Sequence, residues 1–226
     1  MSNRLMPNRL ISRRSFLGST AALMASATAA NAAHPLYGGV DFTRDPNLIP
    51  PAEAAQDFPI AAYEQNLPPR FRRQQVTIGN QSPAGNVVVD PEHRFLYLML
   101  GGDQALRYGV GVGREGFAWS GSAIIGMKRK WPRWLPPESM VERDPHAAQW
   151  ANGMPGGPEN PLGARALYLE ANGIDTLYRI HGTNDPSSIG KAVSSGCVRM
   201  LNEDVADLFE RVKLGTPVTV LAVGTQ

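Results

Sequence analysis

Cysteine is almost missing from this chain: among 226 residues, Cys197 is the only one. No intrachain disulfide can therefore form, and the fold has to rely on its hydrophobic core. The four histidines are scattered without the spacing of a zinc site, so we expect no metal and no cofactor. A lone thiol is either a buried structural residue or a reactive group, and composition alone leaves both readings open.

Acidic residues are missing from the first 33 positions, which carry four arginines. A weakly apolar run, Phe16 to Ala30, comes next, and Ala30-Asn31-Ala32 offers a cleavage site. This order is typical of a signal peptide, which we predict for residues 1–33 with cleavage near Ala32. The run Ser12-Arg13-Arg14-Ser15-Phe16-Leu17 matches the twin-arginine export signal, so we expect an exported, periplasmic protein. A basic, disordered N-terminal arm is the alternative.

Long hydrophobic runs and an excess of charge are missing as well. A membrane-spanning helix needs roughly 20 apolar residues, and the run in the leader is too short and too weakly apolar for that. The mature chain is therefore expected to have no membrane span. Lys and Arg number 22 against 20 Asp and Glu, and removal of the four leader arginines leaves a net charge of −2. A nearly neutral mature protein gives no reason to expect nucleic acid as a partner.

Glycine and proline, by contrast, are abundant, at 23 and 19 residues, which favours a loop-rich, mainly β protein. Residues 34–74 are rich in proline and lack periodicity, and we interpret them as an extended N-terminal segment that wraps the domain or links it to another part. Residues 75–226 are predicted to form one domain. Its expected strands cover residues 75–78, 86–90, 94–100, 105–112, 165–170, 176–181 and 218–223, the first four as consecutive antiparallel hairpins.

One segment has helical periodicity. Val205, Leu208, Phe209 and Val212 recur at the spacing of an apolar helix face, and we expect Asn202 to cap the helix N-terminus. Between residues 113 and 163 we expect a long irregular loop that holds all four tryptophans. Such loops in compact domains are usually functional, and aromatic residues favour order. The tryptophans either line a binding groove or anchor the loop to the core.

The stretch from Ile180 to Asn202 holds the candidate catalytic residues. His181 ends a predicted strand, and Cys197 follows 16 residues later. The thiolate is the nucleophilic form of cysteine, and a neighbouring imidazole can accept its proton. The small Gly196 leaves room for an acyl group, and the N–H groups of Gly196 and Cys197 are candidates for an oxyanion hole. This chemistry requires His181 and Cys197 to meet in space.

The same stretch resembles the L,D-transpeptidase catalytic domain, the YkuD-type family, over roughly residues 75–223. The matching residues are His181, Gly182, Ser194, Gly196, Cys197, Arg199 and Asn202, together with the run Gly157-Pro158 to Asn160-Pro161-Leu162-Gly163. Ser195 stands where the commoner pattern has a second histidine. The resemblance assigns the base to His181 and leaves Ser195 to shape the loop or the oxyanion hole. It implies a mainly β sandwich or barrel with one or two short helices and a long irregular loop.

The resemblance also implies a cysteine-dependent acyltransferase that acts on peptidoglycan peptide stems in cell wall biogenesis and cell shape. Cys197 would form an acyl-enzyme at the bond between diaminopimelate and D-Ala, with His181 as proton donor to the leaving D-Ala. A second stem, or a lysine of an outer-membrane protein, would accept the acyl group. Gly182 is expected to orient His181 and to lie at the substrate, and Arg199 to bind a stem carboxylate or to form a structural salt bridge. A carboxypeptidase that uses water and a silent wall-binding module are the alternatives.

Overall fold

The computed structural model describes residues 57–79, 82–114, 119–194 and 196–224. The predicted signal peptide, the first part of the extended segment and Ser195 lie outside these residues. None of the described helices is long and apolar enough to cross a membrane.

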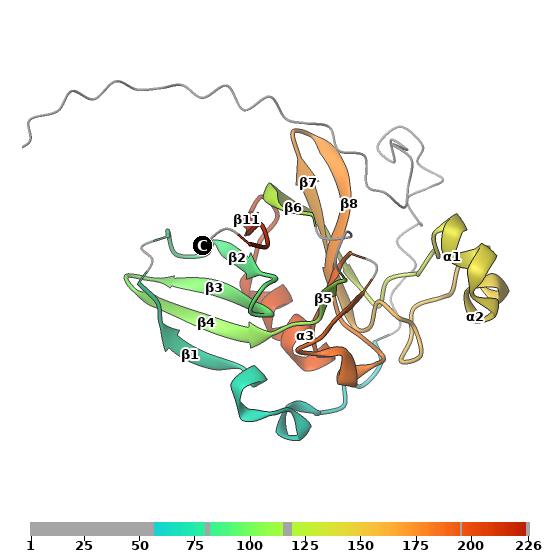
Figure 1. Cartoon of the computed structure of the whole chain (residues 1–226), viewed down its shortest axis with the longest axis horizontal. Helices are drawn as coiled ribbons and strands as arrows, with labels where there is room; N and C mark the ends of the chain where they lie inside the picture. Colours follow the sequence, from blue (N-terminus) through green and yellow to red (C-terminus); the bar gives the residue numbers. More distant parts are fainter. Residues whose placement is uncertain (1–56, 80–81, 115–118, 195, 225–226) are drawn as a thin grey trace, which may run out of the picture. The chain divides into compact units, whose positions relative to one another are not determined.

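More of the described residues lie in strands than in helices, so the mainly β prediction is confirmed (Figure 1). The strands are β1 (Gln74–Thr77), β2 (Val87–Asp90), β3 (Phe95–Gly101), β4 (Gln104–Gly109), β5 (Val112–Gly113), β6 (Gly121–Lys130), β7 (Arg165–Ala171), β8 (Ile174–His181), β9 (Ala192–Ser194), β10 (Val198–Arg199) and β11 (Pro217–Val220). The α-helices of the described residues are α1 (Glu138–Arg143), α2 (Pro145–Gln149) and α3 (Asn202–Arg211), one more than the two at most that we expected. Short 3-10 turns occur at Glu64–Asn66, Pro69–Phe71 and Pro186–Ser188.

Nine strands form one sheet in the order β1-β4-β3-β2-β11-β6-β7-β8-β10, and β5 pairs with β9 in a second, small sheet. The hairpins predicted from β2 to β4 are antiparallel, as expected. The predicted hairpin of the first two strands is wrong, because β1 pairs with β4 and β2 pairs in parallel with β11. Strand β10 instead pairs in parallel with β8, which requires a crossover connection. Leu96 of β3 and Ile180 of β8 belong to one hydrophobic core although their strands are far apart in the sheet order, so the sheet curls around that core.

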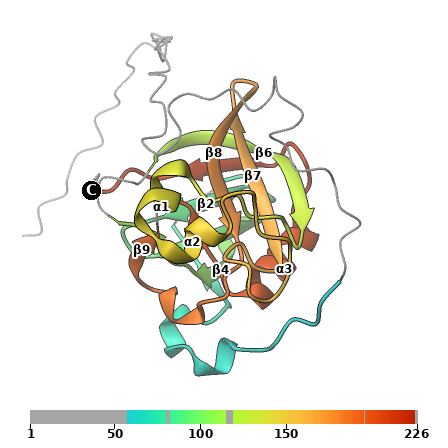
Figure 2. The ribbon, with the colours of Figure 1, turned by 90° about the vertical axis from the view of Figure 1, so that its right-hand side faces the viewer.

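The stretch predicted as an irregular loop contains a central strand, and this part of the prediction is wrong. Strand β6 lies between β11 and β7, and α1 and α2 follow it side by side (Figure 2). Ala123 and Ile125 face the core, but the second half of β6 is basic, and its register shifts at Gly126. Lys128 extends across the core edge to donate to the Val212 carbonyl at 2.7 Å. The basic half and the bulge hide the two-residue alternation that marks a strand in a sequence.

Helix α3 buries Val205, Leu208 and Phe209 of the predicted apolar stripe against the core, and Val212 is buried directly after the helix ends. The predicted cap is wrong, because Leu201 occupies the capping position and Asn202 is already helical. The Asn202 side chain accepts hydrogen bonds from two distant loops instead of from its own helix. A sequence can show that an asparagine precedes a helix, but it cannot show that other N–H donors compete for its oxygen.

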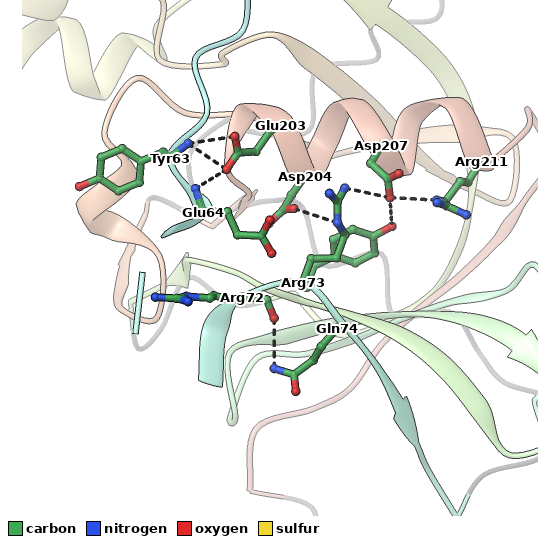
Figure 3. A network of polar contacts seen from close by, with 10 residues as sticks. Tyr63, Glu64, Arg72, Arg73, Gln74, Glu203, Asp204, Asp207 and Arg211 are labelled. Carbon is green, nitrogen blue, oxygen red and sulfur yellow. Dashed lines mark hydrogen bonds and ion pairs between the residues drawn. The ribbon is translucent and has the colours of Figure 1, made fainter. Parts of the chain in front are cut away.

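The described part of the N-terminal segment, residues 57–73, packs against α3 (Figure 3). The Glu203 carboxylate accepts from the backbone N–H groups of Tyr63 and Glu64. Arg73 lies 3.3 Å from Asp207 and 3.8 Å from the buried Asp204. The carboxylates of α3 therefore bind this segment to the domain.

Candidate active site

Strands β8 and β10 bring His181 and Cys197 onto neighbouring parts of the sheet. In this parallel pair, Val198 is the partner of Ile180, and Arg199 is the partner of His181. Cys197 directly precedes β10, so it lies beside the strand that ends at His181. The crossover from His181 to β10 thus converts a separation of 16 residues into proximity across one strand pair.

The Cys197 thiol is oriented toward the edge of β8. Its Sγ donates to the Leu177 carbonyl at 3.9 Å and accepts from the Arg179 backbone N–H. Leu177 has φ of 61°, a left-handed conformation that is rare for leucine, and its N–H donates to Asp175 Oδ1 at 2.8 Å. This irregularity in β8 directs a carbonyl at the thiol.

His181 is 5% exposed at the end of β8, and its Nδ1 lies 2.6 Å from the Gly182 carbonyl oxygen. A carbonyl only accepts, so Nδ1 carries the proton and Nε2 keeps its lone pair. Met200 N–H donates to the His181 carbonyl at 2.8 Å, and Gly182 N–H donates to the Arg165 carbonyl at 3.0 Å. These contacts fix the backbone on both sides of the ring, and the tautomer leaves Nε2 able to accept a proton.

Burial favours the neutral forms of both groups. The pKa of His181 is lowered from 6.5 to about 3, mainly by burial and in part by the charge of Arg199, while the hydrogen bond to Gly182 opposes this shift. Burial raises the pKa of the Cys197 thiol, and the Arg179 charge and backbone N–H oppose that rise. A neutral thiol and a neutral imidazole are therefore the resting state.

Arg179 is a charged neighbour of the thiol that the sequence did not single out. Its guanidinium forms two hydrogen bonds to Asp175, at 2.6 and 2.7 Å, and lies 4.3 Å from the centre of the Tyr168 ring. The i, i+4 spacing of opposite charges was visible but is usually a surface feature. Arg199 is half-buried, and its backbone exchanges hydrogen bonds with Gly111 at 2.8 and 2.9 Å.

The loop before Cys197 has little room. Gly196 has φ of 133°, and a Cβ on Gly113 would lie 2.9 Å from its Cα. The Gly196 N–H donates to Ser194 Oγ at 3.2 Å, and that hydroxyl donates to the Cys197 carbonyl at 2.7 Å. Because the Gly196 N–H is engaged, Cys197 N–H is the remaining backbone donor of the expected oxyanion pair. Ser195 lies outside the described residues.

A small apolar hollow of about 210 Å³, open space included, adjoins Gly196. Trp119 and Tyr178 form part of its wall, and their ring centres lie 5.4 Å apart. The backbone N–H of Trp119 donates to the Tyr178 hydroxyl. Trp131 is 5% exposed and packs against Phe58. The two expected roles of the tryptophans thus fall to different residues: Trp119 lines a hollow, and Trp131 anchors its segment.

The family model and the curated relatives point to one family. Residues 84–220 match the model of the L,D-transpeptidase catalytic domain, YkuD. A probable L,D-transpeptidase, YbiS of Escherichia coli, is 36% identical over 155 residues, which cover 64% of this chain and 47% of that protein. Another from the same organism, ErfK/SrfK, is 32% identical over 151 residues, which cover 66% and 47%. This chain therefore spans about half the length of the curated relatives that it matches.

Among solved structures, a crystal structure of a probable carnitine operon oxidoreductase from Brucella melitensis is 51% identical. The match covers 70% of this chain and 98% of that one, with a TM-score of 0.48. The family model and the curated sequences, and not this structure, assign the family.

Proposed function

Starting from the fact that this chain belongs to the L,D-transpeptidase catalytic domain family, we propose that it is a peptidoglycan L,D-transpeptidase with Cys197 as nucleophile. The observation that carries the proposal is the pairing of β8 with β10, which sets Cys197 beside the strand that ends at a buried imidazole with an available Nε2. A nucleophile, a base and a group that orients the base are the parts that acyl transfer through a thiol requires.

The reaction begins when the Cys197 side chain turns from Leu177 toward His181. Sγ attacks the carbonyl of the bond between diaminopimelate and D-Ala in a tetrapeptide stem, while Nε2 of His181 accepts the thiol proton. The C–N bond breaks, the imidazolium gives that proton to the departing amine, and D-Ala leaves. An acyl thioester remains on Cys197. An acceptor amine then attacks the thioester, loses its proton to Nε2, and releases the thiol.

The neutral resting pair fits this sequence of steps. Because burial opposes a preformed thiolate, proton transfer to His181 accompanies the attack on the carbonyl. The Cys197 N–H is the proposed donor to the oxyanion, and the small Gly196 is proposed to let the stem approach the sulfur. Arg199 is the proposed partner of a stem carboxylate, which would offset the low hydration of its half-buried guanidinium.

The cellular context belongs to the same proposal. The leader sequence and the family support export to the periplasm, where peptide stems are accessible. The acceptor amine is then a second stem, for cross-linking, or a lysine of an outer-membrane protein, for anchoring.

Mass spectrometry after exposure of the protein to a tetrapeptide stem tests the proposal. We expect a mass increase equal to the stem minus D-Ala, located on Cys197 and lost in Cys197→Ala. A folded Cys197→Ala protein that gains the same mass would remove Cys197 as nucleophile. Products formed with an added amine acceptor separate the candidate reactions: a tripeptide product alone indicates a carboxypeptidase, and no adduct at all indicates a silent wall-binding module.

A further inference from the structure

The Asn202 side chain binds two loops that meet beside His181. Its Oδ1 accepts from the Ala164 N–H at 2.9 Å and from the Thr183 N–H at 3.2 Å. Two converging N–H donors require an acceptor, so the amide oxygen, and not the amide nitrogen, has to occupy this position. Asn202 lies at the start of α3, whose core face fixes the helix in place.

The Thr183 N–H belongs to the same peptide group as the Gly182 carbonyl. That carbonyl accepts the Nδ1 proton of His181 at 2.6 Å. Because a peptide group is planar, the direction of its N–H determines the direction of its C=O. A hydrogen bond from Asn202 to one end of this group therefore aims the other end at the imidazole. The bond to Oδ1 also polarises the group and makes the carbonyl a stronger acceptor.

Two glycines enclose the Asn202 oxygen. A Cβ on either Gly163 or Gly182 would collide with Oδ1, and Gly163 has φ of 63°, which favours glycine. Both glycines and Asn202 are among the residues that match the L,D-transpeptidase pattern. Their close packing explains why the three occur together, because the oxygen fits only where neither neighbour has a side chain.

The backbone of β8 is already held without Asn202. The His181 carbonyl accepts from Met200 N–H, and the Gly182 N–H donates to Arg165. Neither contact determines how the following peptide group is rotated. At the end of β8, Asn202 thus contributes the orientation of the Gly182 carbonyl.

We propose that Asn202 is a positioning residue for His181: through the Gly182–Thr183 peptide group it holds the ring in the tautomer with Nδ1 protonated and Nε2 available. This role rests on the proposed function insofar as Nε2 is the base. Among the described contacts of the His181 ring there is no carboxylate. In other nucleophile–histidine sites a carboxylate orients the ring, and here Asn202 does so through a peptide group.

The test compares Asn202→Leu, which lacks the acceptor, with Asn202→Asp, which keeps it. Asn160→Leu is the matched control, because Asn160 is fully buried and also joins loop backbone groups, including the Leu162 N–H at 2.8 Å, without contact to the His181 peptide. Two measurements are made on each folded protein. Nitrogen-15 NMR of the histidine ring, assigned with His181→Gln, gives the tautomer, and the rate of Cys197 acylation by a carbapenem is followed against pH.

We expect one tautomer, with Nδ1 protonated, in the wild type, in Asn202→Asp and in Asn160→Leu. Asn202→Leu is expected to show both tautomers and an acylation rate constant lower by about tenfold or more, with little change in carbapenem affinity. Retention of the single tautomer and of the wild-type pH profile in Asn202→Leu would overturn the proposal. So would the same loss of tautomer in Asn160→Leu.

If Asn202→Leu does not fold, Asn202→Asp decides the matter. A negative charge on the oxygen should act through the peptide group and raise the pKa of the His181 ring, so an unchanged ring pKa contradicts the proposal. The NMR measurement does not depend on activity. A protein with the expected tautomer but no acyl adduct would count against the proposed function and leave the role of Asn202 intact.

Discussion

Asp204 offers a direct test of the electrostatics of α3. Its side chain is 0% exposed, and within the described residues neither carboxylate oxygen has a hydrogen-bond partner. Arg73 lies 3.8 Å away, while Glu64, Glu203 and Asp207 add negative charge (Figure 3). Burial is the main cause that raises the pKa of Asp204 from 3.8 to about 7, and Arg73 only partly opposes it. The folded protein therefore holds a proton on Asp204 that the unfolded chain releases.

The sign of the effect follows from this difference. A raised pKa in the folded state means that the unfolded chain binds fewer protons between pH 3.8 and about 7, so stability falls as pH rises through that range. The shift spans roughly three pH units at about 1.4 kcal/mol each, which sets an upper value of about 4 kcal/mol. Asn in place of Asp204 resembles the protonated form. Asp204→Asn should thus match the wild type near pH 4 and exceed its unfolding free energy by up to about 4 kcal/mol near pH 8.

Urea denaturation followed by tryptophan fluorescence, on both proteins at several pH values, measures this difference. The buried, neutral His181 contributes an opposite slope below about pH 6.5, but both proteins share it, so it cancels in the comparison. Asp207→Asn is the matched control one turn along α3. Burial raises the pKa of Asp207, but hydrogen bonds from Arg211 and Tyr108 outweigh it and lower the pKa, so this variant should lose stability at neutral pH. A difference for Asp204→Asn that stays flat from about pH 4 to about pH 8 would refute the reasoning.

Three further outcomes are expected. His181→Ala should lower the rate of Cys197 acylation by about 100-fold or more, and wild-type turnover in a stem transfer assay would exclude His181 as the base. Arg179→Gln should move iodoacetamide labelling of Cys197 to higher pH, because the variant removes a cation and leaves Asp175 unpaired beside the thiol; an unshifted labelling profile would contradict this. Gly163→Ala should reduce the unfolding free energy by about 2 kcal/mol or more, because the new side chain strains the backbone and collides with Asn202. Gly173→Ala is the control and should cost less, since Gly173 has a similar φ of 75° but open space around it. Equal losses in urea denaturation would refute the collision.

The sequence predicted most of the elements whose pattern is local. The strands at β2, β3, β7 and β8 and the apolar face of α3 follow from alternation or helical spacing, and the structure has them within a few residues. The sequence did not predict strand β6, because the second half of this strand is basic. The aliphatic part of a lysine such as Lys128 can lie along the core while its charge reaches the edge, so apolar and polar residues do not alternate there.

For the site, the sequence identified the chemical groups but not their contacts. His181 and Cys197 stood out because their residue types and spacing suit acyl transfer. Arg179 and the double role of the Asn202 oxygen were not visible, because both depend on which backbone groups tertiary structure brings near. The thiol contact with Leu177 depends on an irregularity in β8, and no residue type marks it in advance.

The short strand β10 is fixed from both flanks, since Met200 bonds to His181 on one side and Arg199 bonds to Gly111 on the other. Strand β10, which directly follows Cys197, therefore cannot swing as a lid does. Movement of the sulfur toward the ring then has to come mainly from the Cys197 side chain, and side-chain rotations are faster than collective loop motions. Acylation should therefore start without a lag when substrate is mixed with the protein, and its temperature dependence should report bond chemistry instead of a slow conformational opening.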